Sequence, residues 1–503
     1  MSYTQAIFYE IFVQSFADSN GDGIGDINGM TAKLDYLQEL GITAVWLMPI
    51  CPSPSYHKYD VTDYYSVHPD YGTLDDFKNF VHQAHARGIK VIIDFVINHT
   101  SSQHPWFLNA RTDIHAKYRD YYIWADKEHV AEQIEKKETS ADSDNIRQWH
   151  PVGTKESTAQ YYYGFFNSDM PDLNHDNPAV RNEVYAIGKF WLWEVGVDGF
   201  RMDAAKHIFP DDRAADTHAF WKAFRAQMQS VKPDAYLIGE VWSDARSASP
   251  YAAGFSSLFN FDLAQSILES VDKRQQKAAA VVGNSYKISE GQRLVDIINE
   301  SAPWFKAHNE HFAEASFLSN HDQNRTASAL GGKADKIKLA ACILFTLPGI
   351  PFIYYGEELG MLGIKPDEHI REPMLWDELE RDTYRTRWIT PRYSTDETVV
   401  PATQQMTDSN SMYSLYKQLI ALKKTALFSL GAIESLPLAG GNILAFSRRL
   451  GEMHALVYHN LSAKKISITI PVGYREAFVR GKVKISDDVL TLGARASLVL
   501  TNP

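Results

Sequence analysis

Residues 181–203, RNEVYAIGKFWLWEVGVDGFRMD, contain a helical pattern followed by a strand pattern, and this pair recurs along most of the chain. Over residues 181–195 the apolar positions have the spacing of an amphipathic helix. Residues 199–202 are a short run typical of a strand, which ends directly at the carboxylate of Asp203. This pair of patterns predicts a strand covered by a helix, the unit from which α/β folds are built.

Seven further strand-like runs alternate with helical patterns such as 31–40 and 74–87. We predict these strands at residues 7–13, 44–48, 91–95, 236–238, 257–261, 315–318 and 351–355. Many of them are nearly continuous apolar runs, as expected of parallel strands covered on both faces. Eight strand–helix units predict an α/β fold closed into a (β/α)₈ TIM barrel.

Two segments depart from this alternation. Residues 101–177 follow the third strand and are polar and rich in aromatics; structureless connections of that length are rare, so we predict an insertion subdomain. After the last barrel helix, residues 431–503 contain short alternating runs that predict a C-terminal antiparallel β domain. Its strands are predicted at 443–448, 455–459, 466–470 and 498–500. The barrel then comprises residues 1–100 and 178–430.

Composition narrows the class of function. The 503 residues carry a net charge of −12, which argues against binding of nucleic acid or an anionic membrane, because both need a basic patch. Cys51 and Cys342 lie in apolar runs and are predicted to be buried thiols. The N-terminus lacks a signal-peptide pattern, and the apolar stretch 339–355 is broken by proline and glycine, so we read it as a buried helix, a turn and a strand. We expect a cytoplasmic protein, or a secreted one if a signal peptide was removed; the oligomeric state stays open.

Functional side chains of such barrels lie where the strands end at the C-terminal face. Four predicted strands run into charged clusters there, at residues 94–99, 199–203, 239–242 and 319–322. Arg201 precedes Asp203 by two residues, so in an extended strand both side chains point to the same face. We predict that its guanidinium keeps this carboxylate ionised, as a nucleophile requires.

The carboxyl group of Glu240 has apolar neighbours in the sequence, Ile238, Val241 and Trp242. Such surroundings would raise its pKa, as a general acid requires. Two carboxyl groups in opposed environments are the arrangement used to cleave a glycosidic bond. The sequence therefore points to glycoside hydrolysis.

In their order and content, the four clusters resemble the four signature regions of the α-amylase family, glycoside hydrolase family 13. The resemblance covers barrel, insertion and C-terminal domain. It implies a retaining enzyme in which Asp203 is the nucleophile, Glu240 the general acid/base, and Asp322 a residue that binds sugar hydroxyls and stabilises the transition state. Further substrate contacts are implied for His57, Tyr59, His99, Arg201, Lys206, His207, His321, Asp367 and Arg371. Among these, Tyr59 would stack on the apolar face of the sugar.

Two features bear on the linkage that is cut. Ala204 stands where branch-cleaving relatives tend to carry valine, and Lys206-His207 resembles a pair found in α-amylases. By contrast, residues 170–174 resemble a region of neopullulanase-like members, and the N-terminus resembles oligo-1,6-glucosidases. We favour cleavage of α-1,4 bonds in starch, glycogen or maltooligosaccharides. The alternatives are an α-glucosidase, a 4-α-glucanotransferase and, more remotely, a non-catalytic amylase-like binding module.

A metal site is expected in the loop after the first strand. Residues 18–26 place oxygen-bearing side chains at loop positions 1, 3, 5 and 9, with a backbone carbonyl at position 7, which is the opening of a calcium loop. The predicted ligands are Asp18, Asn20, Asp22, Ile24 and Asp26, for Ca²⁺ or Mg²⁺. Position 12 is Gly29, so the bidentate glutamate of an EF-hand is missing. A second site, implied by the resemblance, would use Asn98, Asp172 and the carbonyl of His207.

Overall fold

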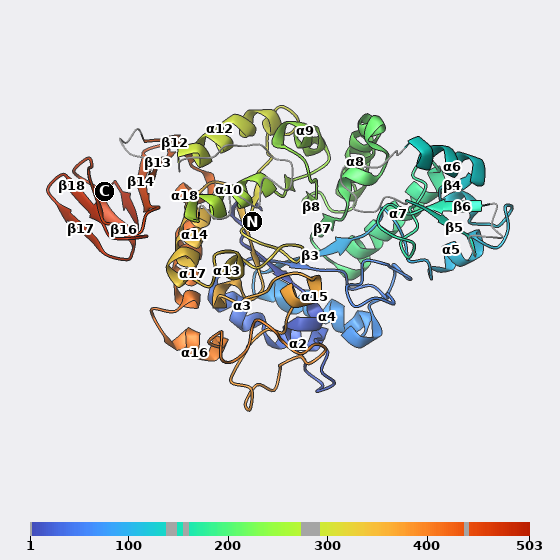
Figure 1. The fold of residues 1–503 in the computed structure, drawn as a ribbon, viewed down its shortest axis with the longest axis horizontal. Helices are drawn as coiled ribbons and strands as arrows, with labels where there is room; N and C mark the ends of the chain where they lie inside the picture. The colour runs from blue at the N-terminus through green and yellow to red at the C-terminus, as the bar shows by residue number, and fades with distance from the viewer. Residues whose placement is uncertain (1–2, 137–147, 154–159, 273–291, 437–441, 503) are drawn as a thin grey trace.

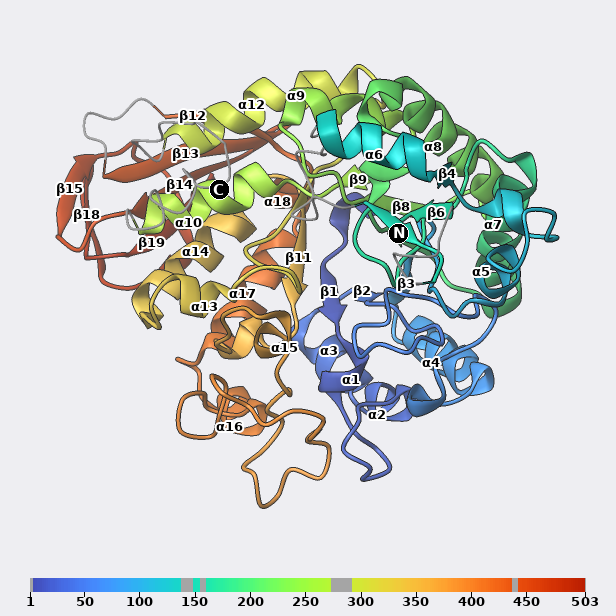
Figure 2. The same ribbon diagram turned by 45° about the vertical axis from the view of Figure 1, so that its right-hand side comes forward.

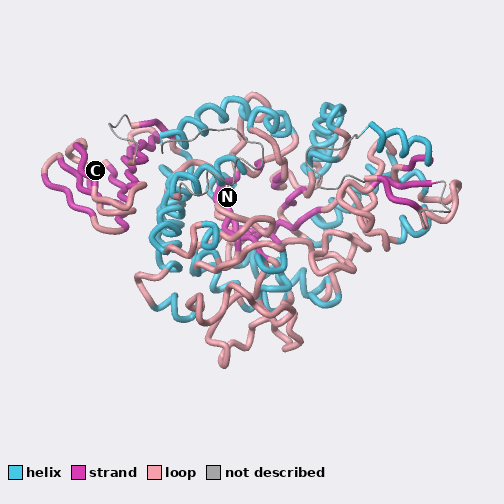
Figure 3. Tube along the Cα trace, in the orientation of Figure 1, coloured by secondary structure: helices cyan, strands magenta, loops and turns pink. Residues whose placement is uncertain are grey.

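The computed structural model describes residues 3–136, 148–153, 160–272, 292–436 and 442–502. Its largest sheet is parallel, with the strand order β10-β11-β1-β2-β3-β7-β8-β9. These strands are β1 (Phe8–Ile11), β2 (Ala44–Leu47), β3 (Lys90–Phe95), β7 (Gly199–Met202), β8 (Tyr236–Gly239), β9 (Ser257–Leu258), β10 (Ala315–Ser316) and β11 (Ile350–Tyr354). A parallel bridge between Phe259 and Ala315 joins the two ends of this order. The sheet therefore closes into the predicted barrel, which lies at the centre of the molecule with helices around it (Figure 3).

The helices between the strands cover the outside of the barrel (Figure 2). In chain order the main ones are α2 (Ile27–Ala32), α3 (Leu34–Leu40), α4 (Leu74–Ala86), α7 (Pro178–Phe190), α8 (Ala214–Gln229), α10 (Phe261–Val271), α12 (Gln292–Lys306), α14 (Ala334–Thr346) and α17 (Met412–Lys423). Shorter ones are α1 (Val13–Phe16), α9 (Ala245–Ala248), α13 (Thr326–Ala329), α15 (Asp367–Ile370), α16 (Ala402–Thr407) and α18 (Ala426–Leu430). The helix predicted over 181–195 starts earlier and ends in a wider turn, Trp191–Val195.

Side chains alternate between the inside and the outside of the barrel, as the period of two in a strand requires. Phe8 and Trp46 belong to the apolar cluster inside the barrel, whereas Tyr9 belongs to the cluster between strands and helices. By the same alternation Glu10, two residues after Phe8, faces inward and is opposite Trp46 in register. The apolar interior thus gives way to polar side chains at the carboxyl ends of the strands.

The insertion and the C-terminal domain lie at opposite ends of the view in Figure 1. The insertion contains α5 (Pro105–Ala110), α6 (Lys127–Lys136) and a sheet of order β4-β6-β5, formed by β4 (Trp124–Asp126), β5 (Trp149–Pro151) and β6 (Gln160–Tyr163). Its own apolar cluster includes Phe107, Tyr122 and Leu173. The long connection after β3 is therefore a folded subdomain with a core of its own, as predicted, and not a structureless loop.

The C-terminal domain is antiparallel, as predicted, but richer in strands than its apolar pattern indicates. Its strands are β12 (Ala432–Ser435), β13 (Ile443–Leu450), β14 (Met453–Asn460), β15 (Ile466–Thr469), β16 (Arg475–Arg480), β17 (Val483–Ser486), β18 (Val489–Leu492) and β19 (Ser497–Thr501). They form sheets of order β12-β13-β14-β19-β16 and β15-β18-β17. Strands such as β12 and β16 expose most of their side chains, so they carry little of the apolar signal from which a strand is predicted.

Two smaller predictions are confirmed. Cys51 and Cys342 are buried free thiols. The apolar stretch 339–355 is the end of α14, a turn and β11. Among the described residues, no helix is both long and apolar enough to cross a membrane.

Candidate active site

Arg201 on β7 lies at the centre of a buried charged cluster at the mouth of the barrel, and its side chain is 1% exposed. Its Nη1 is 2.7 Å from Oδ1 of Asp203 and 2.8 Å from Oδ1 of Asp94. Its Nη2 is 2.7 Å from Oε2 of Glu240. One guanidinium therefore holds three carboxylates that come from β3 and from the ends of β7 and β8. The pairing of Arg201 with Asp203 agrees with the position of both on one face of the strand.

The protonation of Asp203 differs from the prediction. Burial raises the pKa of Asp203 to about 8, since it outweighs the attraction of Arg201, and the carboxylates of Glu240 and Asp94 add to the rise. The reason is that one guanidinium is divided among three buried carboxyl groups. Asp203 and Glu240 are bound to different nitrogens of this one guanidinium, whose single positive charge cannot balance all the carboxyl groups around it.

The surroundings of Glu240 are not the apolar ones that its sequence neighbours suggest. Besides Arg201, the Nε1–H of Trp242 donates to Oε1 of Glu240 over 3.0 Å, and the backbone N–H of Ala204 donates to Oε2 over 3.3 Å. Ile238 instead belongs to the apolar cluster inside the barrel. The prediction of opposed environments for the two carboxyl groups is therefore wrong: both are bound by the same cation.

Ala204 follows Asp203 in a left-handed backbone conformation, with φ 47° and ψ 38°. This conformation turns its backbone N–H toward Glu240, 3.3 Å away. A left-handed residue other than glycine is strained, and a β-branched side chain there would be more strained still. The small alanine is thus the side chain that suits this turn.

Asp322 lies in the loop after β10, with a side chain that is 29% exposed. Its Oδ2 is 3.0 Å from Nε2 of His321, and its Oδ1 is 3.1 Å from Nη2 of Arg371. Burial would raise its pKa, but the charges of His321 and Arg371 hold the pKa of Asp322 well below its usual range. This carboxyl group is therefore ionised at any physiological pH.

His321 is buried between two carboxylates. Its Nδ1 is 2.6 Å from Oε1 of Glu10, and its Nε2 is the atom that faces Asp322. Burial lowers the pKa of His321, but Asp322 and Glu10 outweigh burial and raise it to about 10. The ring is thus an imidazolium in the folded protein.

Tyr59 and Arg371 belong to the same part of the site as His321 and Asp322. The hydroxyl of Tyr59 lies 2.6 Å from Nε2 of His321 and 3.2 Å from Oδ2 of Asp94, and its ring is stacked on His321. Nη2 of Arg371 also binds Oδ2 of Asp367 over 3.1 Å. The structure thus brings these predicted contact residues into one network with Asp322.

His57 and His99 lie on either side of Tyr59. Nδ1 of His57 accepts the backbone N–H of Tyr59 over 3.1 Å, and Nε2 of His99 is 3.2 Å from the Tyr59 carbonyl oxygen. Burial lowers the pKa of both imidazoles, that of His99 to about 4. These two neutral histidines fix the backbone that carries the tyrosine.

Lys206 and His207 lie in a short turn, Ala205–His207, which follows Asp203 in the chain. Nζ of Lys206 is 3.9 Å from Oδ1 of Asp211, and the ring of His207 is stacked on Phe165 of the insertion at 4.0 Å. The turn therefore joins the barrel to the insertion.

Two buried carboxylates of the cluster were given no role from the sequence: Glu10, which lies outside the four charged segments, and Asp94, which opens the segment 94–99. Each occupies an inward position near the carboxyl end of a barrel strand, β1 or β3. The signal was a charged residue inside an otherwise apolar strand, since an unpaired charge is costly in such a place. This signal marks Glu10 as well as Asp94.

Comparison with known proteins gives the family of this chain. The family model described as the α-amylase catalytic domain matches residues 10–430. The chain belongs to the α-amylase family. α-Amylase 3 of Dictyoglomus thermophilum is 46% identical over 461 residues, 92% of this chain and 85% of that protein. A 4-α-glucanotransferase of Thermotoga maritima is 35% identical, over 92% of this chain and 96% of that protein. The crystal structure of the α-amylase from H. orenii superposes with a TM-score of 0.85 at 39% identity, covering 99% of both chains. The protein is thus an α-amylase-type glycoside hydrolase that acts on α-glucans.

The metal loop has some but not all features of a cation site. The carboxylate of Asp18 accepts three backbone N–H groups of the loop, and Asn20 and Asp22 each accept the N–H two residues later. The carboxylate of Asp26 instead binds Ser19 and caps α2. In the part of the chain that the structure describes, no group of three or more His, Cys, Asp or Glu side chains could hold a metal ion. The oxygen donors fit Ca²⁺ in kind, and a site here would depend on Asn20 and backbone carbonyls as well.

The residues of the second expected metal site lie at the junction of barrel and insertion. His99 and Asp172 form a backbone bridge, and Asn98 hydrogen-bonds to the Asp172 side chain. Burial raises the pKa of Asp172 to about 8. A buried carboxyl group with neutral partners fits a cation in its chemistry, and the site stays a prediction.

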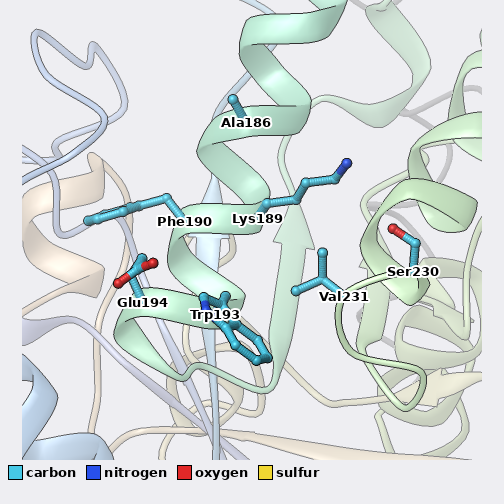
Figure 4. Close-up of a pocket in the computed structure, with 7 residues that line it drawn as sticks. All are labelled: Ala186, Lys189, Phe190, Trp193, Glu194, Ser230 and Val231. Atoms are coloured by element: carbon cyan, nitrogen blue, oxygen red, sulfur yellow. The ribbon is translucent and has the colours of Figure 1, made fainter.

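A hollow on the outer helical layer lies away from this cluster. It is lined by residues of α7, of the turn after it and of the segment after α8, among them Phe190, Trp193 and Val231 (Figure 4). None of the predicted site residues lines it. This hollow is therefore separate from the candidate active site.

Proposed function

We propose that the protein hydrolyses α-1,4-glucosidic bonds in starch, glycogen or maltooligosaccharides with retention, through a covalent glycosyl-enzyme intermediate. The observation that carries this proposal is the pair of carboxyl groups on one guanidinium, Asp203 on Nη1 and Glu240 on Nη2 of Arg201. A retaining glycosidase needs two carboxyl groups close enough for one to attack while the other donates a proton. The shared cation keeps them close.

In the first step the Asp203 carboxylate attacks the anomeric carbon, and the bond from that carbon to the leaving oxygen breaks. Glu240, as the general acid, passes a proton to the leaving oxygen, so the departing sugar ends as an alcohol. The ionised Asp322 supports this step by accepting hydrogen bonds from sugar hydroxyls and by stabilising the positive charge that develops on the sugar ring.

In the second step a water molecule attacks the same carbon. Glu240 takes the proton of that water, and the bond between the sugar and Asp203 breaks, which restores both carboxyl groups. Two displacements at one carbon retain its configuration. Tyr59 would pack its ring on the apolar face of the sugar while Arg371 and Asp367 bind its hydroxyls.

The preference for α-1,4 bonds is supported by Ala204 and by Lys206 and His207, which lie in the turn that follows Asp203 in the chain. The left-handed backbone at Ala204 explains why a small residue suits this chain. The relative from Thermotoga maritima named 4-α-glucanotransferase supports a second candidate, transfer of the glycosyl group to another sugar instead of water.

Products from maltoheptaose test the proposal. We expect α-anomeric products at early times in proton NMR, with several maltooligosaccharide lengths released together, because a retaining endo-acting enzyme cuts inside the chain. β-Anomeric products would contradict retention. Glucose released singly from the non-reducing end would instead indicate an α-glucosidase, and products longer than the substrate a glucanotransferase.

We also propose that Asp18, Asn20, Asp22, Asp26 and the carbonyl of Ile24 bind Ca²⁺, with Mg²⁺ as a competitor. The bound ion would stabilise the loop after β1 and take no part in the reaction. A cation at 100 times its Kd stabilises the folded state by about 2.7 kcal/mol. We therefore expect chelation to lower the Tm and added Ca²⁺ to restore it, and Asp22→Asn, which keeps the turn but removes a charge, to weaken the effect. An identical Tm with chelator and with Ca²⁺ would overturn the proposal, and the same test on Asp172→Asn addresses the second site.

A further inference from the structure

Glu10 is a buried carboxylate inside the barrel, 1% exposed, with no part in the mechanism above. Its Oε1 lies 2.6 Å from Nδ1 of His321 and 3.3 Å from the backbone nitrogen of the same residue. The two residues are 311 positions apart in the sequence. Through Glu10, β1 therefore fixes the position of His321, the residue before Asp322.

The geometry of the ring determines its protonation. An ionised carboxylate accepts hydrogen bonds and donates none. Nδ1 of His321 faces the Glu10 carboxylate, and Nε2 faces the Asp322 carboxylate at 3.0 Å. Each nitrogen therefore needs a proton of its own. A neutral ring would turn a lone pair toward one of the two carboxylates.

The hydroxyl of Tyr59 fits the same direction of hydrogen bonds. It lies 2.6 Å from Nε2 of His321 and donates to Oδ2 of Asp94 over 3.2 Å. With its own hydrogen committed to Asp94, the Tyr59 oxygen accepts from the imidazolium. The hydrogen bonds thus run from Glu10, through His321, to Asp322 and to the Tyr59 hydroxyl.

We propose that Glu10 is a positioning residue that keeps His321 doubly protonated. The imidazolium then holds the Asp322 carboxylate in place and keeps it ionised, so that it can stabilise the transition state. The inference rests on the proposed role of Asp322. The groups that contact His321 are Glu10 on β1, Tyr59 after β2, the adjacent Asp322, and Arg371 after α15, which binds its carbonyl oxygen. Asp94 on β3 and Arg201 on β7 lie beyond the Tyr59 hydroxyl, at 3.2 Å and 3.4 Å from it. Arg201 and Arg371 would oppose a positive charge, which makes the Glu10 carboxylate the counter-charge on the inner side.

Glu10→Gln tests the charge without changing the shape, since the amide oxygen still accepts the Nδ1–H bond. The His321 signal is followed by NMR in histidine-labelled enzyme without substrate and is identified by its absence in His321→Gln. We expect the wild-type ring to stay doubly protonated at pH 8, and Glu10→Gln to lower the His321 pKa by roughly 1 to 3. The alkaline limb of the kcat profile then shifts to lower pH. The expected loss of kcat at pH 8 reaches about tenfold at the upper end of that range, because a pKa that falls from about 10 to about 7 leaves about a tenth of the rings doubly protonated at pH 8.

Glu358→Gln is the matched control, because Glu358 is equally buried but bonds to Tyr9 and Tyr36. We expect it to leave the His321 titration unchanged. A wild-type His321 that is neutral at pH 7, or one that titrates alike in wild type and Glu10→Gln, would overturn the inference. Failure of the proposed function would appear separately, as β-anomeric products or as hydrolysis that survives loss of Asp203.

Discussion

Asp203→Asn is expected to lower kcat for maltooligosaccharide hydrolysis by about 10⁴-fold or more, with the barrel intact. The amide cannot form the ester bond to the sugar, so the first displacement has no nucleophile. The carboxamide still fits beside Arg201, which donates to Oδ1 of Asp203 over 2.7 Å. Initial rates on maltoheptaose, measured with excess enzyme, give the size of the loss.

The stability of this variant separates lost chemistry from lost folding. Burial raises the pKa of Asp203 to about 8, which means that the folded protein favours the neutral side chain. We therefore expect the Tm of Asp203→Asn at neutral pH to equal or exceed that of the wild type. Asp212→Asn, an exposed residue nearby in the sequence, serves as the control and should keep full activity. Hydrolysis within tenfold of wild type would refute the assignment of the nucleophile.

Arg201→Met is expected to cost about 3–5 kcal/mol of stability in addition to activity. The substitution keeps much of the volume of the side chain but leaves three buried carboxyl groups, those of Asp94, Asp203 and Glu240, without their shared cation. Uncompensated buried charges are among the most destabilising changes in proteins. Thermal unfolding of the two proteins side by side measures the cost.

The penalty should depend on pH in a defined direction. Burial raises the pKa of Asp94 to about 6 and that of Asp203 to about 8 in the wild type, and loss of Arg201 raises both further. A carboxyl group with a raised pKa in the folded state destabilises it more as pH rises. Below about pH 6 both proteins hold these two groups protonated, so the difference in Tm between wild type and variant should shrink there and widen toward pH 8.

Arg448→Met provides the comparison, because Arg448 is equally buried but donates to backbone carbonyls of Thr346, Phe428 and Gly431. Carbonyl groups do not titrate. We expect its penalty to be nearly constant between pH 5.5 and pH 8. A Tm difference for Arg201→Met that is equally flat would show that the three carboxylates do not depend on this guanidinium.

The barrel could be predicted because its signal is local. Nearly continuous apolar runs mark strands that are covered on both faces, and the predicted strands match the observed ones to within a few residues. The C-terminal domain was predicted less completely, since β12 and β16 expose most of their side chains and so lack an apolar pattern. The same locality explains why Arg201 and Asp203 could be paired in advance: they are two residues apart on one strand.

The environment of Glu240 shows where such reasoning ends. Its sequence neighbour Ile238 lies in the barrel interior, while the carboxylate itself meets Arg201 from the adjacent strand. Neighbours along a strand share a backbone, but their side chains take different surroundings. The pKa of a group depends on those surroundings, which are set by strand register.

The sequence by itself determined the fold class, because apolar runs mark the strands, and it predicted that Asp203, Glu240 and Asp322 follow the ends of barrel strands, because each comes soon after such a run in the chain. Only the tertiary structure decided which charges these groups face. Arg201 is divided among three carboxylates, and Glu10 meets His321 across 311 positions of sequence. Electrostatic interactions act over a few ångströms in space, so they become defined only when barrel closure brings distant strands together.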